Sequence, residues 1–394
     1  MPIKNSITVI GLGYVGLPLL IELNKKFDVK GYDNDIQKIK YIKNNKIDFV
    51  STKTLSKTYI TSNINECKSD IYIICLPTPT YKNKKPDLRI LISFLKKLKK
   101  IIKKNDLIIF ESTYYPGTSK YLAETYISDD KFLLKKDYKI GYSPERINPG
   151  DKFNTLKKTT KLISAIDKTS LKIVKNIYSN ICNNIHVCDT IEIAEMSKLI
   201  ENSQRDINIA YMNEVFKICD NYNLNFNSVL KAAKTKWNFL NFYPGLVGGH
   251  CIAVDSYYLS QFAKNNNQNL DLIDSARNIN ESMVNYYAKI IKRNVKKSEK
   301  FLVLGYSFKE NVSDIRNSKN LTLIKNVSKY FPNFYFFDPL VENRSIEKFI
   351  SEKKIKFKTF DKILILVKHN YFEYKAKIIN KLLKSNGKFV KIIN

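Results

Sequence analysis

The first half of the chain alternates short β-rich runs with helical patterns. Two runs, Ile71–Leu76 and Leu107–Phe110, are continuously apolar and bounded by breaking residues, as expected for strands buried on both faces. Two earlier strands are predicted over Ser6–Ile10 and Asp28–Asp33, with an apolar-periodic helix from 16 to about 25. Strands separated by helices indicate a parallel, doubly wound sheet.

The middle of the chain is predicted to be mostly helical. One long helix is expected from Asp189 to about Tyr222, opened by Asp189 as N-cap with Glu192 in a capping box. A second long helix is expected over 271–295. Between them, the Pro- and Gly-rich segment 238–255 cannot be regular helix, so a special loop interrupts the helical region.

The alternation of strands and helices restarts near Lys300, with strands predicted over Phe301–Gly305, Phe334–Asp338 and Lys362–Val367. A chain of 394 residues has the length of two to three domains. The predicted fold class is α/β, with two Rossmann-like doubly wound domains joined by a long central helix and a helical middle domain. The expected domains are 1–188, 189–297 and 298–394.

The net charge of +30, from 67 basic and 37 acidic residues, raises nucleic acid or an anionic membrane as a partner. The basic residues are 60 Lys and seven Arg, and the lysines are spread along the whole chain. Nucleic-acid surfaces favour Arg for bidentate contacts, and a basic tail forms a local run. Neither pattern is present. We attribute the charge to Lys enrichment by an A/T-rich coding bias and expect no nucleic-acid or membrane partner.

Export signals and metal-site patterns are both missing from the sequence. The first residues contain no apolar stretch typical of a signal peptide, and no apolar run approaches the roughly 18 to 20 residues of a transmembrane helix. The six cysteines show no C-x-x-C spacing, and there are only three histidines. We therefore expect a reduced, cytoplasmic protein without a metal site.

A glycine pattern follows the first predicted strand. The residues GLGYVG at 11–16 fit G-x-G-x-x-G, which allows a tight turn and the close approach of a pyrophosphate to a helix N-terminus. Asp33 ends the next strand, 20 residues after Gly13, where a carboxylate binds the ribose hydroxyls. An acid there repels a 2′-phosphate, so NAD is favoured over NADP. The alternative is a glycine turn in an α/β domain that binds no ligand.

Two later strands end in polar segments that suit a cofactor crevice. Thr78 and Thr113 follow the strands at 71–76 and 107–110, and ligands bind beyond the carboxyl ends of such strands. Both threonines are candidate contacts. A strand-end cap is the alternative for each of them.

The loop at 142–150, YSPERINPG, places Glu145 between a proline and Arg146. Glu145 is a candidate general base, and Arg146 a candidate partner for an anion. The alternative is a surface loop whose ion pair contributes little energy, and composition alone favours it.

Lys198 and Asn202 lie four residues apart on the long central helix and therefore share a face, which Arg205 and Asp206 continue. A neighbouring ammonium and amide can stabilise a developing oxyanion. In a chain with 60 Lys, a solvated helix face is the alternative that the residues alone favour.

The loop YPGLVGGHCIAVD at 243–255 is the most informative segment. Gly248 and Gly249 allow a sharp bend that puts Cys251 at the start of the following helix. The positive helix end there lowers the pKa of a thiol and makes the thiolate available as a nucleophile. Asp255, one turn on, can orient a water. The alternative is a buried, inert cysteine.

Taken together, these segments resemble the UDP-glucose/GDP-mannose dehydrogenase family over almost the whole chain. The variants SPERINPGD, ENSQRD, TKWNF and PGLVGGHC are most similar to the branch that oxidises UDP-N-acetylhexosamines for surface polysaccharides. The resemblance to this branch implies UDP-N-acetylglucosamine or UDP-N-acetylgalactosamine as substrate. The resemblance rests on GLGYVGLP (11–18), CLPTPT (75–80), EST-x-x-PGT (111–118), YSPERINPGD (142–151), AEMSKLIENSQRDINIAYMNE (194–214), PGLVGGHCIAVD (244–255) and GYSFKENVSDIRNS (305–318).

The resemblance implies oxidation of a sugar C6 alcohol to a carboxylate with two NAD⁺. Cys251 is then the thiolate that adds to the intermediate aldehyde, and the resulting thiohemiacetal becomes a thioester. Glu145 is implied as the base for hydrolysis, and Asp255 orients or activates the water. Lys198 and Asn202 are implied to stabilise the oxyanions.

The resemblance also implies binding residues and partners. Thr113 holds a water near the reacting carbon, the third domain binds the uridine nucleotide, and a homodimer forms on the long central helix. Cofactor contacts are predicted for Gly11, Gly13, Tyr14, Val15, Gly16, Asp33, Thr78, Thr113 and Arg316. Substrate contacts are predicted for Glu145, Arg146, Asn148, Lys198, Asn202, Phe242, Tyr243, Gly245, Gly248, Phe308 and Lys309.

Three alternatives stay open at this point. UDP-glucose or UDP-N-acetylmannosamine is an alternative substrate within the same family. A two-electron dehydrogenase of 3-hydroxy acids shares the dinucleotide domain and the long helix, but it needs neither a cysteine in a Gly-Gly loop nor a second α/β domain. A catalytically silent structural or nucleic-acid-binding protein predicts binding that salt weakens steeply, and no NADH.

Overall fold

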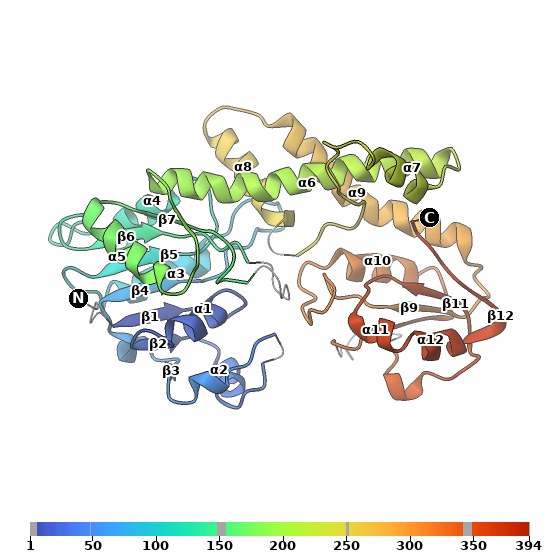
Figure 1. The fold of residues 1–394 in the computed structure, drawn as a ribbon, viewed down its shortest axis with the longest axis horizontal. Helices are drawn as coiled ribbons and strands as arrows, with labels where there is room; N and C mark the ends of the chain where they lie inside the picture. The colour runs from blue at the N-terminus through green and yellow to red at the C-terminus, as the bar shows by residue number, and fades with distance from the viewer. Residues whose placement is uncertain (1–5, 48, 148–154, 250–251, 342–348, 394) are drawn as a thin grey trace. The chain divides into compact units, whose positions relative to one another are not determined.

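The structure, a computed structural model, describes residues 6–47, 49–147, 155–249, 252–341 and 349–393. The chain divides into two compact units. Unit 1 comprises Met1–Glu201 and Tyr257–Gln268, and unit 2 comprises Asn202–Ser256 and Asn269–Asn394. Helix α6, Ile191–Asn221, begins in unit 1 and ends in unit 2 (Figure 1).

Unit 1 is built on a sheet of eight strands in the order β3-β2-β1-β4-β5-β6-β7-β8. The predicted doubly wound α/β arrangement is confirmed, with one difference: β6 and β7 pair antiparallel. A parallel pair needs a long crossover, usually a helix, and the described parts of the β6–β7 connection, 143–147 and 155–160, contain no helix. The strands are β1 Ile7–Ile10, β2 Val29–Tyr32, β3 Tyr59–Thr61, β4 Ile71–Ile74, β5 Leu107–Phe110, β6 Lys139–Tyr142, β7 Lys161–Ala165 and β8 Ile185–Val187.

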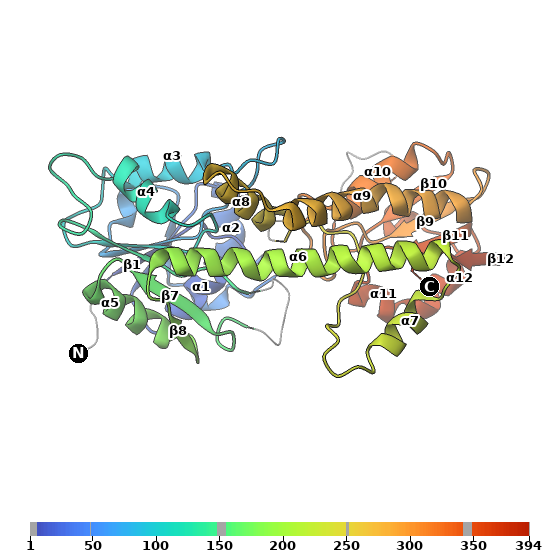
Figure 2. The ribbon, with the colours of Figure 1, turned by 90° about the horizontal axis from the view of Figure 1, so that it is seen from above.

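Helices cover both faces of this sheet. Figure 2 shows α3 and α4 on one side and α1 and α5 on the other. The apolar side chains of α1 and α5 pack with those of β1, β4 and β5 into one buried core. The helices are α1 Gly16–Leu23, α2 Ile36–Lys43, α3 Arg89–Leu98, α4 Thr118–Tyr126 and α5 Lys168–Ser179, with short 3₁₀ turns η1 Lys53–Leu55 and η2 Ile64–Cys67.

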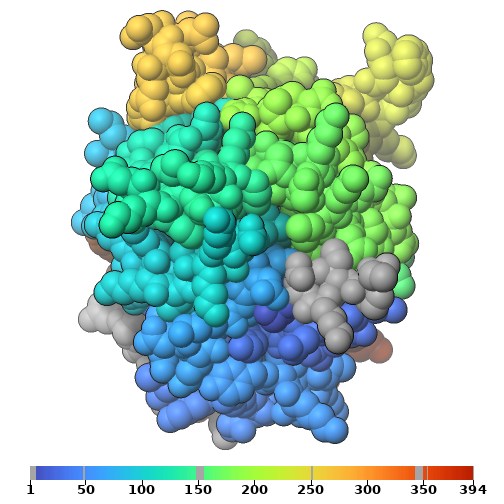
Figure 3. Space-filling view, turned by 90° about the vertical axis from the view of Figure 1, so that its left-hand side faces the viewer, coloured from blue at the N-terminus to red at the C-terminus, as the bar shows by residue number. Residues whose placement is uncertain are grey.

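Figure 3 looks onto one face of unit 1. The blue residues from the first strands occupy the lower part of this face, and the teal and green residues that follow in the chain lie above them. The order in the view matches the sheet, in which β1 to β4 form one half and β5 to β8 the other.

In unit 2, helix α9, Asp271–Asn294, lies beside the second half of α6 (Figure 2). Met212 and Phe216 of α6 share a buried core with Met283 and Tyr287 of α9. The two other helices of this region are α7 Phe226–Ala233 and α8 Ile252–Asn265, the second of which continues into unit 1.

Two predictions for the helical region need correction. The hydroxyl of Thr190, not the Asp189 carboxylate, accepts from the N–H of Ile193 at the start of α6, so the cap lies one residue later than predicted. The segment 238–255 was expected to contain no regular helix. In fact α8 already begins at Ile252, because Pro and Gly are confined to the residues before it.

The second sheet lies in unit 2 and has the order β10-β9-β11-β12, with every pair parallel. The predicted second Rossmann-like sheet is confirmed, and three of its strands were predicted. Its elements are β9 Phe301–Leu304, α10 Lys319–Ser328, β10 Phe334–Phe337, η3 Glu352–Lys354, β11 Phe360–Ile365, α11 Asn370–Tyr374, α12 Ala376–Leu382 and β12 Leu383–Phe389. Across the described residues, no helix has both the length and the apolar character to cross a membrane.

Candidate active site

The glycine loop joins β1 to α1 at the carboxyl edge of the first sheet. Gly11 has a φ of +86°, a backbone conformation that other residues rarely adopt. A Cβ built on Gly16 lies 2.0 Å from the carbonyl oxygen of Gly11, so only glycine fits there. A Cβ on Gly13 meets nothing within 4 Å, so the middle of the loop faces open space. The loop is thus tightly folded and leaves room for a ligand against its backbone.

Asp33 follows β2 and is buried beside this loop. Its Oδ2 accepts from the N–H of Leu12 at 2.9 Å and from Lys38 Nζ at 2.8 Å, and its Oδ1 accepts from the N–H of Asp35 at 3.0 Å. A carboxylate offers about four acceptor positions, so one remains for a ribose hydroxyl. Together with the open side of Gly13, this geometry fits a dinucleotide such as NAD.

The structure brings Thr78 and Thr113 together beyond the ends of β4 and β5. The hydroxyl of Thr78 donates to the carbonyl of Thr113 at 2.6 Å, and the hydroxyl of Ser112 donates to the carbonyl of Leu76 at 2.7 Å. The hydroxyl of Tyr258 donates to the carbonyl of Thr78 at 3.1 Å. In the strand order β3-β2-β1-β4-β5, the winding reverses between β1 and β4, the point at which such sheets bind ligands.

Glu145 lies beside a buried ion pair, formed by Lys161 and Glu111, which was not predicted from the sequence. Lys161, which opens β7, donates to Glu111 Oε2 at 2.7 Å and to the carbonyl of Pro144 at 3.1 Å. Its Nζ lies 3.6 Å from Glu145 Oε2. Tyr178 donates to the other oxygen of Glu111. Burial alone would lower the pKa of Lys161, but the carboxylates of Glu111 and Glu145 outweigh it and raise that pKa, so the amine is an ammonium.

Arg146 forms an ion pair within unit 1. Its Nη2 lies 2.8 Å from Glu201 Oε1, its Nε donates to Glu201 Oε2 at 3.1 Å, and its Nη1 donates to the carbonyl of Thr160 at 2.6 Å. All three nitrogens of the guanidinium thus have protein partners. Asn148, predicted to contact substrate, lies outside the described residues.

Glu195, in the first turns of α6, holds the segment that follows Thr113. Its carboxylate accepts from the N–H of Gly117 at 2.6 Å and from the N–H and hydroxyl of Ser119 at 2.9 Å and 2.6 Å. Burial raises the pKa of Glu195 to about 7, although these hydrogen bonds oppose the rise. The start of α4 is therefore fixed by a side chain from α6.

Lys198 and Asn202 occupy successive turns of α6. Lys198 is only 8% exposed, and within the described parts of the chain its ammonium has neither a hydrogen bond nor an ion pair. Asn202 Nδ2 donates to Asp255 Oδ2 at 2.5 Å, so the structure brings these two predicted residues together. Asp206, four residues after Asn202, is buried and continues this face, whereas Arg205 is exposed. Cys251 lies outside the described residues.

The second sheet repeats the geometry of the first at its own carboxyl edge. Gly305 follows β9 with a φ of +82°, and the N–H groups of Tyr306 and Ser307 donate to Asp338 Oδ2 at 2.8 Å and 3.1 Å. Asp338 follows β10 as Asp33 follows β2. His369, after β11, contacts the same oxygen through Nε2 at 3.1 Å. Unit 2 therefore has a second candidate nucleotide crevice.

Three segments of unit 2 meet at Gly249. The amide of Asn317 donates to the carbonyl of Gly249 at 2.7 Å, and the N–H of Gly249 donates to the carbonyl of Asn317 at 3.1 Å. A Cβ on Gly249 would lie 2.8 Å from the ring of Phe308, and one on Gly248 would lie 2.6 Å from the carbonyl oxygen of Asn317. Phe308 and Gly248, both predicted substrate contacts, therefore both lie beside Gly249.

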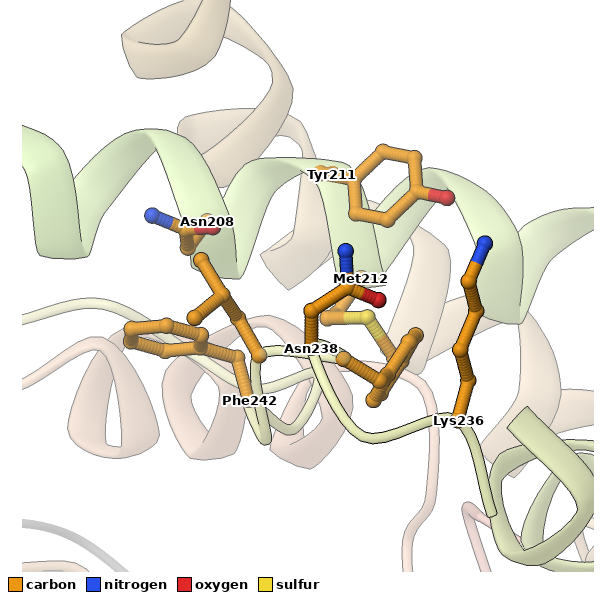
Figure 4. Close-up of a pocket in the computed structure, with 8 residues that line it drawn as sticks. Asn208, Tyr211, Met212, Lys236, Asn238 and Phe242 are labelled. Carbon is orange, nitrogen blue, oxygen red and sulfur yellow. The ribbon is translucent and has the colours of Figure 1, made fainter. Parts of the chain in front are cut away.

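Phe242 lines a cavity of about 320 Å³ between α6 and the loop after α7. Figure 4 shows side chains of α6 on one side of it and side chains of the loop, Phe242 among them, on the other. Tyr243 instead is exposed, and its hydroxyl accepts from Lys234 Nζ at 2.6 Å. The lining residues are Asn208, Tyr211, Met212, Lys236, Asn238, Phe239, Leu240 and Phe242.

Arg316 and Lys309 lie on the loop that follows β9. Arg316 Nη2 donates to Asp314 Oδ2 at 2.5 Å, and most of its side chain is exposed. The carbonyl of Lys309 accepts from the hydroxyl of Ser307 at 2.9 Å. No group of three or more His, Cys, Asp or Glu side chains in the described ranges is placed to hold a metal ion.

A glycine loop at a sheet switch point, a carboxylate after the second strand and a second candidate crevice of the same build define a Rossmann-type protein with a dinucleotide site that fits NAD. Comparison with known proteins makes the assignment specific. The chain belongs to the UDP-glucose/GDP-mannose dehydrogenase family: it matches the NAD binding domain over residues 5–182, the central domain over 192–282 and the UDP binding domain over 302–392. A 3-hydroxy-acid dehydrogenase, one of the alternatives above, does not account for the match to the UDP binding domain.

Individual relatives cover nearly the whole chain. Protein CapL of Staphylococcus aureus is 40% identical over 98% of this chain and 94% of its own. UDP-N-acetyl-D-glucosamine 6-dehydrogenase of Salmonella typhi is 36% identical over 93% of this chain and 91% of its own. A solved structure of UDP-D-ManNAc dehydrogenase from Pyrococcus horikoshii superposes with a TM-score of 0.85 at 29% identity, over 99% of this chain and 96% of that one. The predicted family and branch are confirmed, and NAD is the cofactor.

Proposed function

We propose that this chain oxidises the C6 alcohol of a UDP-N-acetylhexosamine to the carboxylate, for surface polysaccharide biosynthesis. The observation that carries the proposal is the buried ammonium of Lys198, which has no partner in the described parts of the chain and lies one helical turn from Asn202. A buried charge without a partner is costly. A site that binds an anion or stabilises an oxyanion accounts for that cost.

NAD, when bound, takes up the electrons that each oxidation removes from the sugar. The glycine loop of 11–16 would hold its pyrophosphate and Asp33 its ribose, with Tyr14, Val15, Thr78, Thr113 and Arg316 as further proposed contacts. All of these residues act by binding and orienting.

The remaining steps are proposed for side chains of unit 2, of the central helix and of the loop after β6, which carries Glu145. The thiolate of Cys251 adds to the aldehyde, and Lys198 and Asn202 stabilise the oxygen that becomes negative. After the second oxidation the thioester carbonyl carries a similar charge when water attacks, so the same two groups act again. Asn202 also fixes the Asp255 carboxylate through their hydrogen bond. Glu145 is the proposed base for that water.

The N-acetylhexosamine is favoured by the named relatives, which include an N-acetylglucosamine enzyme and an N-acetylmannosamine enzyme. An NADH-linked screen of UDP-glucose, UDP-N-acetylglucosamine, UDP-N-acetylgalactosamine and UDP-N-acetylmannosamine tests this point. We expect UDP-N-acetylglucosamine or UDP-N-acetylgalactosamine to have the highest kcat/KM. Turnover of UDP-glucose alone would contradict the proposal.

Cys251→Ser tests the covalent route. We expect this variant to stall after or during the second oxidation, because serine is a weaker nucleophile at neutral pH than a cysteine thiolate. Analysis of the products by mass spectrometry, beside Cys219→Ser as a control at a buried cysteine of unit 2, distinguishes this stall from a loss of folding. Full turnover by Cys251→Ser would remove the residue from the mechanism.

We also propose that the chain forms a homodimer along α6 and that its three family segments act as separate domains. Four exposed apolar side chains of α6 and Tyr222, directly after its last residue, are spaced 7, 11, 7 and 4 residues apart, which keeps the four within roughly 40° of one helix face. They are Ile193, Ile200, Tyr211, Ile218 and Tyr222. Sedimentation equilibrium is expected to give twice the 45.8 kDa of the chain, and Ile218→Lys about once that mass. A monomeric wild type would refute the dimer.

A further inference from the structure

A buried chain of polar side chains in unit 2 begins at the loop that carries the proposed substrate contacts. Asn213 of α6 is fully buried, and its amide holds both backbone groups of Gly245. The N–H of Gly245 donates to Asn213 Oδ1 at 2.8 Å, and Asn213 Nδ2 donates to the carbonyl of Gly245 at 3.1 Å. One side chain therefore fixes the position and the orientation of this peptide segment.

The chain continues from Asn213 into the packed pair of α6 and α9. Asn213 Nδ2 also donates to Asn280 Oδ1 at 2.8 Å, and Asn280 Nδ2 donates to Asp206 Oδ1 at 2.7 Å. Arg277 Nη1 donates to the same Asp206 oxygen at 2.7 Å. All four side chains are buried, so each hydrogen bond is made away from water and a lost partner is expensive.

The same network reaches the far end of the loop. The hydroxyl of Ser256, the fifth residue of α8, donates to Asp206 Oδ2 at 2.9 Å. Gly245 and Ser256 bound the segment that contains the proposed nucleophile and the glycines of the substrate loop. A single set of buried hydrogen bonds, centred on Asp206, therefore anchors both ends of that segment.

Two observations argue that this network does more than fill the helix interface. An interface between two helices is stabilised equally well by apolar side chains, and an ionic group in it gives no stability advantage over them. Here the polar atoms point to the two ends of one glycine-rich loop. The backbone of such a loop loses much conformational entropy when it is ordered, and these hydrogen bonds offset that loss. Asn317 adds a third anchor in the middle of the loop, at Gly249.

We propose that Asn213 is a positioning residue, which acts through Gly245 to hold the loop of 245–249 in the geometry that binds the nucleotide sugar. The inference rests on the proposed function of this loop. Asn213 does not touch substrate, so its effect is expected on the affinity for the sugar nucleotide and not on the affinity for NAD.

The test is Asn213→Ala in the full-length protein, with steady-state kinetics and calorimetric titration of UDP-N-acetylglucosamine in the absence of NAD. We expect KM and Kd for the sugar nucleotide to rise at least tenfold, since small misplacements of binding groups cost up to about a hundredfold in rate. The Kd for NAD is expected to stay within twofold of the wild type. Asn221→Ala, an exposed amide at the end of the same helix, is the matched control and is expected to behave as the wild type.

Two further variants separate the outcomes. Asn213→Ala with Asn280→Ala should raise the sugar-nucleotide KM by less than the product of the two single effects, because residues of one network are not additive. Ser256→Ala, which removes one hydroxyl and little volume, is expected to raise the sugar-nucleotide KM about fivefold and keeps the test open if Asn213→Ala does not fold. Sugar-nucleotide KM and Kd values at the wild-type level in both Asn213→Ala and Ser256→Ala would overturn the positioning role. A lower kcat at unchanged KM would also overturn the positioning role, because a smaller fraction of folded protein gives that same result. A wild type that oxidises no UDP-sugar would refute the proposed function instead.

Discussion

The buried ion pair between Lys161 and Glu111 gives a sharp prediction about stability. Each of these two side chains is 2% exposed, and their atoms lie 2.7 Å apart. In Lys161→Met the carboxylate of Glu111 loses its cation but keeps its burial. Leaving one partner of a buried pair unpaired costs about 3–5 kcal/mol, and we expect the unfolding free energy of unit 1 to fall by that amount.

The double variant Lys161→Met with Glu111→Met removes both charges. A buried pair is often replaced by apolar side chains at no loss of stability. Here the hydroxyl of Tyr178 and the carbonyl of Pro144 lose their partners, which costs about 1–2 kcal/mol. The double variant is therefore expected to recover about 1–4 kcal/mol relative to Lys161→Met.

The loss of unfolding free energy in Lys161→Met should depend on pH. Burial raises the pKa of Glu111, and without the ammonium only the hydrogen bond from Tyr178 still opposes that rise. A carboxyl whose folded pKa lies above its unfolded pKa stabilises the fold at low pH and loses that contribution as pH rises through the folded pKa. The variant is thus expected to lose more stability at pH 8 than at pH 5.

Urea unfolding followed by far-UV circular dichroism measures these differences. Hydrogen exchange in peptides from β5 and β7 assigns them to unit 1. Tryptophan fluorescence is a poor probe, because the chain has one Trp, which is 92% exposed and lies in unit 2. A loss below about 1 kcal/mol in Lys161→Met, or a double variant no more stable than the single one, would refute the reasoning.

Three more predictions concern single residues. Gly16→Ala places a methyl 2.0 Å from the Gly11 carbonyl oxygen. The Kd for NAD should therefore rise at least tenfold, while the affinity for UDP is unchanged. An NAD affinity equal to that of the wild type, measured by calorimetry, would contradict this prediction. Lys198→Met should lower kcat about 10²–10³-fold, the usual cost of one oxyanion-stabilising group, and a wild-type kcat would exclude the role. Burial raises the pKa of Glu195 from 4.5 to about 7. Between these two pH values the folded state holds a proton that the unfolded state has lost. The unfolding free energy is therefore expected to fall by about 3 kcal/mol as pH rises from 4.5 to about 7. Glu195→Gln should remove that slope in urea titrations at pH 5 and 8, and a slope that persists would assign it to another group.

The central strands were predictable because they are apolar on both faces. β4 and β5 are continuous apolar runs between breaking residues, and the periodicity of α6 and α9 gave their bounds to within two residues. The strand β12, with the sequence LKSNGKF, was not predicted. It is an edge strand that is mostly polar and contains glycine, and its pairing with β11 decides its structure against its propensity.

The candidate site was predictable where a residue type is rare or its spacing special. The glycine loop and Asp33 belong to this class. Asn202, which the structure joins to Asp255 by a hydrogen bond, was given a role only by the family resemblance. Lys161 could not be found in the same way, because it is one of 60 lysines and only the fold makes it a buried one. Asn213 and Asn280 were missed for the same reason, since asparagine on a long helix is ordinarily exposed. Asn213 and Asn280 each lie at a position where the helical periodicity predicts an apolar residue. A polar residue at such a position is the signal that could have identified both.

The most direct test of the proposed four-electron oxidation is the stoichiometry of NADH. With a limiting amount of the UDP-N-acetylhexosamine that turns over fastest, the absorbance at the end of the reaction gives the NADH formed per sugar nucleotide consumed. The proposed oxidation of an alcohol to a carboxylate predicts two NADH, with a UDP-sugar acid as the only product. One NADH per sugar, with an aldehyde or ketone as product, would contradict it.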